Sequence, residues 1–131
     1  MSKYLVAFYN GTNETIKFVN TEHSGDDKTL PPSSMFTTAV HFNIPDNSDP
    51  EKYFDDHHME IQNAAGAAIF SFWDDDDNEY IIKYCNGTNW KAGINTMPGY
   101  NPPGNETDVG IVLTGTPQQY QIKSCSVQLK V

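Results

Sequence analysis

Apolar residues in this chain recur at every second position or form short runs rich in Val, Ile, Phe and Tyr, bounded by Asn, Gly, Asp and Pro. A period of two is the pattern of strands, and no helical stripe, heptad or βαβ alternation is visible. The 131 residues therefore predict a single all-β domain, an antiparallel β-sandwich of about eight strands with little helix. The expected strands are Lys3–Tyr9, Thr15–Asn20, Ser34–Phe42, His58–Gln62, Ala67–Trp73, Glu79–Cys85, Val109–Leu113 and Gln119–Val131.

The first two expected strands have apolar residues of matching parity on either side of the turn Asn10–Asn13. This match predicts a hairpin with one buried face. Helix is expected only as one turn around Pro50–Phe54, where Pro and Glu stand in first-turn positions.

The last expected strand contains two apolar sets of opposite parity. Tyr120 and Ile122 point one way, whereas Cys125 and Val127 point the other. Because one strand cannot bury both sets on a single face without an extra residue, we expect a bulge near Lys123–Ser124.

The charge of the chain excludes some classes of partner. It has eight lysines, no arginine and 17 acids, for a formal net charge of -9. Because phosphate recognition uses Arg forks or Lys clusters, we expect no nucleic-acid partner. No segment approaches the roughly 20 apolar residues of a membrane span, and the first residues do not form a conventional signal peptide. We expect a protein that is cytoplasmic or released without such a signal. Cys85 and Cys125 are either free thiols or one disulfide.

Two acidic segments have the residue types of metal ligands. The run Asp74–Asp77 is expected to be a solvated turn between strands, with Ca²⁺ bound by Asp74 and Asp76 as the alternative. The segment Asp55–His58 is expected to be an acidic strand entry, since adjacent histidines on a strand point to opposite faces. Neither segment predicts a specific metal site. No catalytic motif is present, so we expect a protein that is not an enzyme.

The segment from residue 86 to residue 108 is long for a loop in a compact domain and carries Trp90 and Tyr100. Aromatic faces beside amides such as Asn89 and Asn101 suit sugar rings, and the same aromatics suit a membrane interface. In the opposing interpretation, Trp90 plugs the end of the sandwich. The four residues Trp90, Tyr100, Asn89 and Asn101 form the candidate ligand site.

Three stretches resemble the aegerolysins, which are small acidic β-proteins. They are the opening KYLVAFYNGTNETIKFVN, the proline-containing LPPSSMFTT and the strand AIFSFWDDDD. The resemblance implies a β-sandwich that binds specific membrane lipids and sometimes helps a partner protein to form pores. It adds Trp73 and Asp74 to the candidate site.

We therefore expect a non-enzymatic protein that recognises a membrane lipid headgroup, with a cytolytic or defence role. The alternatives are a lectin that binds a glycan with the residue 86–108 segment, and an enzyme inhibitor that presents this proline-rich loop. Oligomer formation is compatible with each of these functions.

Overall fold

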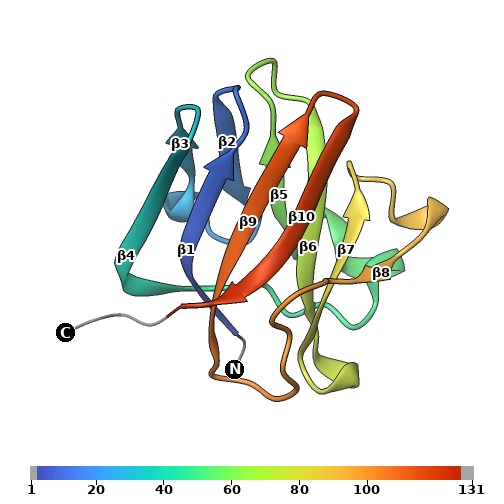
Figure 1. Ribbon diagram of the computed structural model, residues 1–131. Helices are drawn as coiled ribbons and strands as arrows, with labels where there is room; N and C mark the ends of the chain where they lie inside the picture. The colour runs from blue at the N-terminus through green and yellow to red at the C-terminus, as the bar shows by residue number, and fades with distance from the viewer. Residues whose placement is uncertain (1–2, 128–131) are drawn as a thin grey trace.

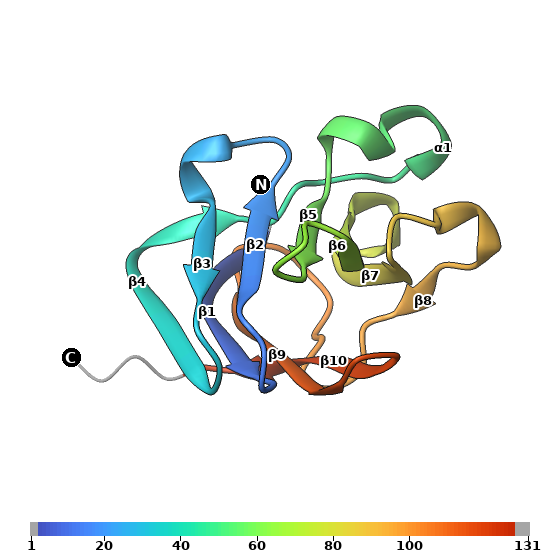
Figure 2. The ribbon, with the colours of Figure 1, turned by 90° about the horizontal axis from the view of Figure 1, so that it is seen from above.

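Two sheets pack face to face in the computed structural model, which describes residues 3–127 apart from the side chains of residues 38–41 (Figure 1). The four-stranded sheet has the order β10-β9-β1-β4, and the six-stranded sheet has the order β3-β2-β5-β6-β7-β8. Figure 2 shows the two layers from above. The strands are β1 (Tyr4–Gly11), β2 (Ile16–Asn20), β3 (Lys28–Leu30), β4 (Ser34–Asn43), β5 (Met59–Gln62), β6 (Ala68–Asp75), β7 (Ile81–Asn86), β8 (Asn95–Thr96), β9 (Asp108–Thr116) and β10 (Gln119–Ser126).

The core lies between the two sheets, where the inner faces of the strands meet. Phe8 of β1 packs across the interface against Phe18 of β2, with ring centroids 5.8 Å apart. Burial of apolar area between the sheets is the main favourable term in folding. The predicted all-β sandwich is confirmed. Its buried core residues are Leu5, Phe8, Ile16, Phe18, Leu30, Ile44, Met59, Ile61, Phe70, Phe72, Ile82, Met97, Val109, Ile111, Leu113 and Ile122.

The pairing within the sheets is antiparallel except between β1 and β9, which run parallel. This pairing places β1 inside the four-stranded sheet, between β9 and β4. The predicted helical turn is present as α1 (Pro50–Tyr53), with Pro50 at its start. The 3₁₀ turns are Ser24–Asp26, Phe54–Asp56, Asp76–Asn78 and Trp90–Ala92.

The predicted hairpin of the first two strands is wrong, because β1 and β2 belong to different sheets. The buried Asn10 turns the chain from one layer to the other. Its amide nitrogen donates to the carbonyls of Glu14 and Pro31, at 2.8 and 3.0 Å. Strands that face each other across a sandwich bury residues of matching parity, just as neighbours in one sheet do. The sequence pattern therefore could not distinguish these arrangements.

The bulge predicted near Lys123–Ser124 is also wrong, since β10 pairs residue for residue with β9. Ser124 occupies the buried position and donates its hydroxyl to the carbonyl of Tyr100 at 2.5 Å. Cys125 and Val127 line the outer face of the four-stranded sheet. The change of parity in the sequence thus marks a second apolar surface. The predicted continuation to Val131 lies outside the described residues.

Two short strands and several strand boundaries also differ from the predictions. β3 and β8 were not expected, and β8 lies inside the predicted loop, paired with β7. β6 continues through Asp75, and β7 begins only at Ile81. Both cysteines are free thiols, with Cys85 buried. Its burial raises the pKa of that thiol to about 11.

Met97 is the residue after β8 and is 2% exposed within the core between the sheets. We predict that Met97→Ala lowers the free energy of unfolding by about 2–5 kcal/mol, because it leaves a cavity. Ile94→Ala is the control in the same segment, since Ile94 is 41% exposed, and it should cost less than about 1 kcal/mol. Urea denaturation measures both variants. Equal costs would contradict this assignment of Met97 to the core.

Candidate functional site

The segment of residues 86–108 is bound to both sheets by backbone hydrogen bonds. On the six-stranded sheet, the Met97 N–H donates to the carbonyl of Ile82 at 2.9 Å. On the four-stranded sheet, the Ser124 N–H donates to the carbonyl of Pro98 at 2.9 Å, and the Tyr100 N–H donates to that of Ser124 at 3.0 Å. The segment therefore bridges the two layers along one side of the sandwich.

Asn101 uses its side-chain amide to replace a missing strand partner. The Ile82 N–H donates to Asn101 Oδ1 at 3.0 Å, and Asn101 Nδ2 donates back to the Ile82 carbonyl at 3.1 Å. The same nitrogen also donates to the Met97 carbonyl at 3.3 Å. Because these bonds engage the amide within the fold, Asn101 has a structural role in this arrangement.

The predicted aromatic pair is divided between two environments. Trp90 is half-buried and packs against the small cluster of Phe54, Trp73 and Cys85. Tyr100 is 39% exposed beside Ser124 of β10. Asn89 is exposed, and its backbone N–H donates to the Asn86 carbonyl at 3.0 Å. The structure therefore does not gather the four predicted residues around one hollow.

Trp73 and Asp74 lie inside the protein. Trp73 is 1% exposed and packs edge-on against Phe54, while Asp74 is 0% exposed. The expectation that the acids from Asp74 onward form a solvated turn is wrong at this position, because β6 extends two residues further than predicted. Both side chains lie beyond the reach of a surface ligand, so we do not retain them as ligand contacts.

Asp74 joins three segments at one end of the sandwich. Its Oδ2 accepts the Lys3 N–H at 2.8 Å, and its backbone carbonyl accepts the Asn47 N–H at 2.7 Å. Its Oδ1, like that of Asp46, is buried without a hydrogen-bond partner in the described part of the chain. Burial raises the pKa of Asp74 to about 8, against the opposing effect of the Lys3 N–H, and the charge of Asp46 also raises it. Burial therefore favours the protonated form of Asp74.

Calcium at Asp74 and Asp76 remains a hypothesis about these residues. Asp76 belongs to the 3₁₀ turn Asp76–Asn78, and its charge contributes to the raised pKa of Asp74. Within residues 3–127, no group of three or more His, Cys, Asp or Glu side chains is arranged to hold a metal ion.

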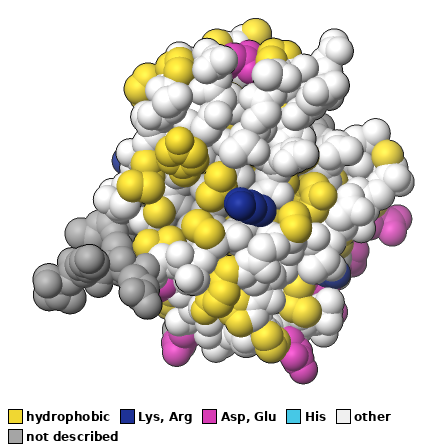
Figure 3. All heavy atoms as spheres, viewed as in Figure 1, with side chains coloured by type: hydrophobic (Ala, Val, Ile, Leu, Met, Phe, Trp, Pro, Cys, Tyr) yellow, Lys and Arg dark blue, Asp and Glu magenta, His cyan; other side chains and the backbone are white. Residues whose placement is uncertain are grey.

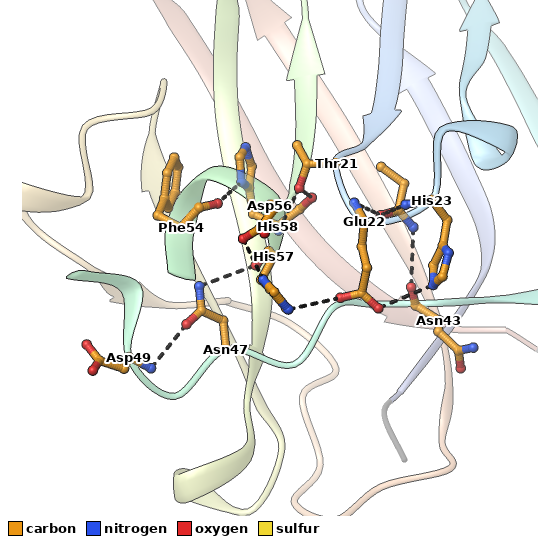
Figure 4. A network of polar contacts seen from close by, with 11 residues as sticks. Thr21, Glu22, His23, Asn43, Asn47, Asp49, Phe54, Asp56, His57 and His58 are labelled. Atoms are coloured by element: carbon orange, nitrogen blue, oxygen red, sulfur yellow. Dashed lines mark hydrogen bonds and ion pairs between the residues drawn. The ribbon is translucent and has the colours of Figure 1, made fainter. Parts of the chain in front are cut away.

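The histidine pair in the other acidic segment belongs to a polar network between loops (Figure 4). His57 Nε2 lies 3.8 Å from a carboxylate oxygen of Glu22, and His57 Nδ1 lies 2.7 Å from Asp56 Oδ1. His58 is buried and stacks on Phe54, with ring centroids 4.1 Å apart. The two imidazoles thus contact different partners, and the network joins the loop after β2 to the turn after α1.

A cleft of about 500 Å³ opens at the β10 edge, where it reaches from the space between the two sheets onto the outer face of the four-stranded sheet. Phe70 and Tyr84 come from the six-stranded sheet and Tyr120 from the four-stranded sheet, whereas Pro98 and Gly99 come from the bridging segment. Pockets of this size with apolar walls and a few polar groups are the usual form of small-molecule sites. The other lining residues are Asn86, Val112, Thr114, Gln121, Ile122 and Lys123.

A second hollow, of about 440 Å³, lies on the outer face of the four-stranded sheet. Met35 is 60% exposed there and pairs across the strands with Tyr9. Gly110 makes room for this surface, because a Cβ at that position would lie 2.7 Å from Val127 Cγ2 and 2.8 Å from Cys125 Sγ. We call this surface the outer apolar face. It is lined by Ala7, Tyr9, Met35, Thr37, Gly110, Ile111, Val112, Cys125, Ser126 and Val127.

Neither hollow was predicted from the sequence. The parity change in the last strand is a sequence signal of the outer apolar face, not of the predicted bulge. The cleft had a weaker signal, since Asn86, Pro98 and Gly99 lie in the predicted loop. Its other residues come from four strands and meet only through the sheet order.

Comparison with known proteins gives no match to a family model, to a curated protein or to a solved structure. The aegerolysin resemblance therefore rests on the sequence motifs alone. Among the described residues, no helix is long and apolar enough to cross a membrane.

We predict that the titration of Asp74 lowers the free energy of unfolding as the pH rises from 5 to 9. The pKa of Asp74 is raised on folding, so the folded state binds more protons than the unfolded state through this window, and stability decreases with pH. The Asp74→Asn variant should show a smaller decrease, by an amount on the order of a few kcal/mol. Asp55→Asn, at an exposed acid, is the control and should retain it. Urea denaturation at several pH values measures the decrease, and an unchanged decrease in Asp74→Asn would disprove the assignment.

Proposed function

We propose that this chain is a non-enzymatic recognition protein that binds membrane lipid surfaces through the outer apolar face. The observation that carries this proposal is an apolar surface that has no acidic side chain among its described lining residues, on a chain with 17 acidic residues. A continuous exposed apolar surface commonly marks an interaction site. Figure 3 displays this side of the molecule, where apolar side chains gather around a basic one over β1, β9 and β10 and acidic side chains lie toward the margins.

The side chains on this face suit the boundary between lipid headgroups and acyl chains. Tyr9 offers an aromatic ring with a polar end, and Met35 offers a flexible apolar chain. Lys123 pairs across the strands with Val112 and so adds a positive charge beside the hollow. These groups support shallow interfacial contact rather than deep insertion.

The overall charge limits the lipids that this surface would favour. A formal net charge of -9 is repelled by an anionic bilayer, so electrostatic attraction does not supply the affinity. Neutral or zwitterionic headgroups avoid this repulsion. A lipid-binding role agrees with the aegerolysin-like motifs, and a defence or cytolytic activity would follow from it.

We predict that the wild-type protein sediments with zwitterionic phosphatidylcholine vesicles and less with vesicles that also contain phosphatidylserine. Met35→Glu should weaken binding about tenfold or more, since it removes apolar contact and places a charge against the lipid.

The matched control is Ile94→Glu, which makes the same charge change at an exposed apolar residue in the segment before β8. It should bind vesicles as the wild type does. Equal binding by Met35→Glu and the wild type would remove the outer apolar face from the lipid site, as would loss of binding in Ile94→Glu alone.

A further inference from the structure

The cleft between the sheets combines aromatic surface with hydrogen-bonding groups. Tyr84 of the six-stranded sheet is half-buried and presents part of its ring to the cleft, and Phe70, which is only 6% exposed, packs edge to face against it with ring centroids 5.8 Å apart. The opposite wall includes Tyr120, whose hydroxyl donates to the carboxylate of Glu14. This contact fixes the orientation of the Tyr120 ring and places its apolar body along the cleft.

Polar groups border these aromatic rings. Asn86 is exposed at the cleft, and Gln121 and Thr114, which pair across β10 and β9, add an amide and a hydroxyl where the cleft reaches the outer face of these strands. Within the described part of the chain, no hydrogen bond engages the amide of Asn86 or Gln121, in contrast to the amide of Asn101. These amides can therefore donate to and accept from a ligand.

The free edge of β10 supplies a further row of hydrogen-bonding groups. Both backbone groups of Ser124 point away from β9, toward Pro98 and Tyr100. Because strand backbone groups alternate in direction, those of Ile122 and Tyr120 point toward the same edge. Within residues 3–127, the bridging segment pairs with this edge at Ser124 alone, through the bridge to Gly99. The edge beside Tyr120 and Ile122 thus faces the cleft.

The charge of the residues that line the cleft indicates which ligands it can bind. Among the described residues that line the cleft, Lys123 alone is charged, and its charge is positive. A cationic ligand is therefore disfavoured, although the protein as a whole is acidic. A neutral or carboxylate-bearing ligand meets no repulsion in the cleft.

We propose that this cleft binds a pyranose sugar, stacked against its aromatic walls and hydrogen-bonded by Asn86, Gln121 and the free edge of β10. A sugar ring offers an apolar C–H face to an aromatic ring and hydroxyls to amides and backbone groups. The cleft has room for one or two sugar rings. This site shares Asn86, Pro98 and Gly99 with the residue 86–108 segment of the predicted lectin but does not include Trp90 or Tyr100, and it does not depend on lipid binding by the outer apolar face.

The test begins with an array of neutral and acidic glycans and continues with calorimetric titration of the best free oligosaccharide. Asn86→Ala and Gln121→Ala should each weaken binding several-fold, and the double variant about tenfold or more. Gln119→Ala is the matched control, because it lies on the same exposed side of β10 but outside the cleft. It should bind within about twofold of the wild type.

Separate readouts distinguish this proposal from lipid binding. Met35→Glu should keep full affinity for the oligosaccharide, and Gln121→Ala should keep its binding to sugar-free vesicles. Comparing the binding of the protein to vesicles with and without a glycolipid that bears the same sugar would show whether the protein binds this sugar when it is attached to a lipid.

Three results would overturn the proposal. The first is the absence of binding to any glycan on the array. The second is glycan binding that the double variant leaves intact. The third is that the β10 edge binds an extended peptide and does not bind a sugar.

Discussion

Strand edges expose backbone groups that need partners, and the segment from Met97 to Asn101 supplies partners to both sheets at once. Its hydrogen bonds to Ile82 on one layer and to Ser124 on the other hold the two layers together along one side. Met97 adds a buried side chain to this connection. The proline-rich segment is thus part of the framework, which explains why a region with little regular structure carries large apolar residues.

The position of this bridging segment determines which surfaces remain available. It covers the β10 edge at Ser124 and leaves the edge beside Ile122 open, so a cleft forms between the layers. The outer apolar face lies on the four-stranded sheet next to this cleft, and Val112 lines both hollows. A lipid surface on the outer face would therefore place the mouth of the cleft close to the headgroups. The two proposed activities are separable, yet they would act side by side.

The sequence was informative about local structure and much less about how the strands meet. The alternation of apolar and polar residues predicted most strands and the sandwich class, because a strand that is buried on one face alternates in this way. The same patterns could not place β1 and β2 in different sheets, since residues facing across the core share the parity of hairpin neighbours. Asp74 illustrates a second limit, because an acid after a strand resembles a turn residue until the buried N–H of Lys3 is known. The site depends on sheet order, which no local pattern specifies.

The central claim is that ligands meet the outer apolar face and the adjoining cleft rather than the surface around Trp90 and Ile94. Amide NMR spectra of the vesicle-bound protein, recorded with lipids that carry a nitroxide in the headgroup region, test this most directly. Our account predicts the strongest line broadening at Tyr9, Met35 and Val112, with Trp90 weakly affected. Broadening concentrated at Trp90 and Ile94, with the outer face unaffected, would contradict it.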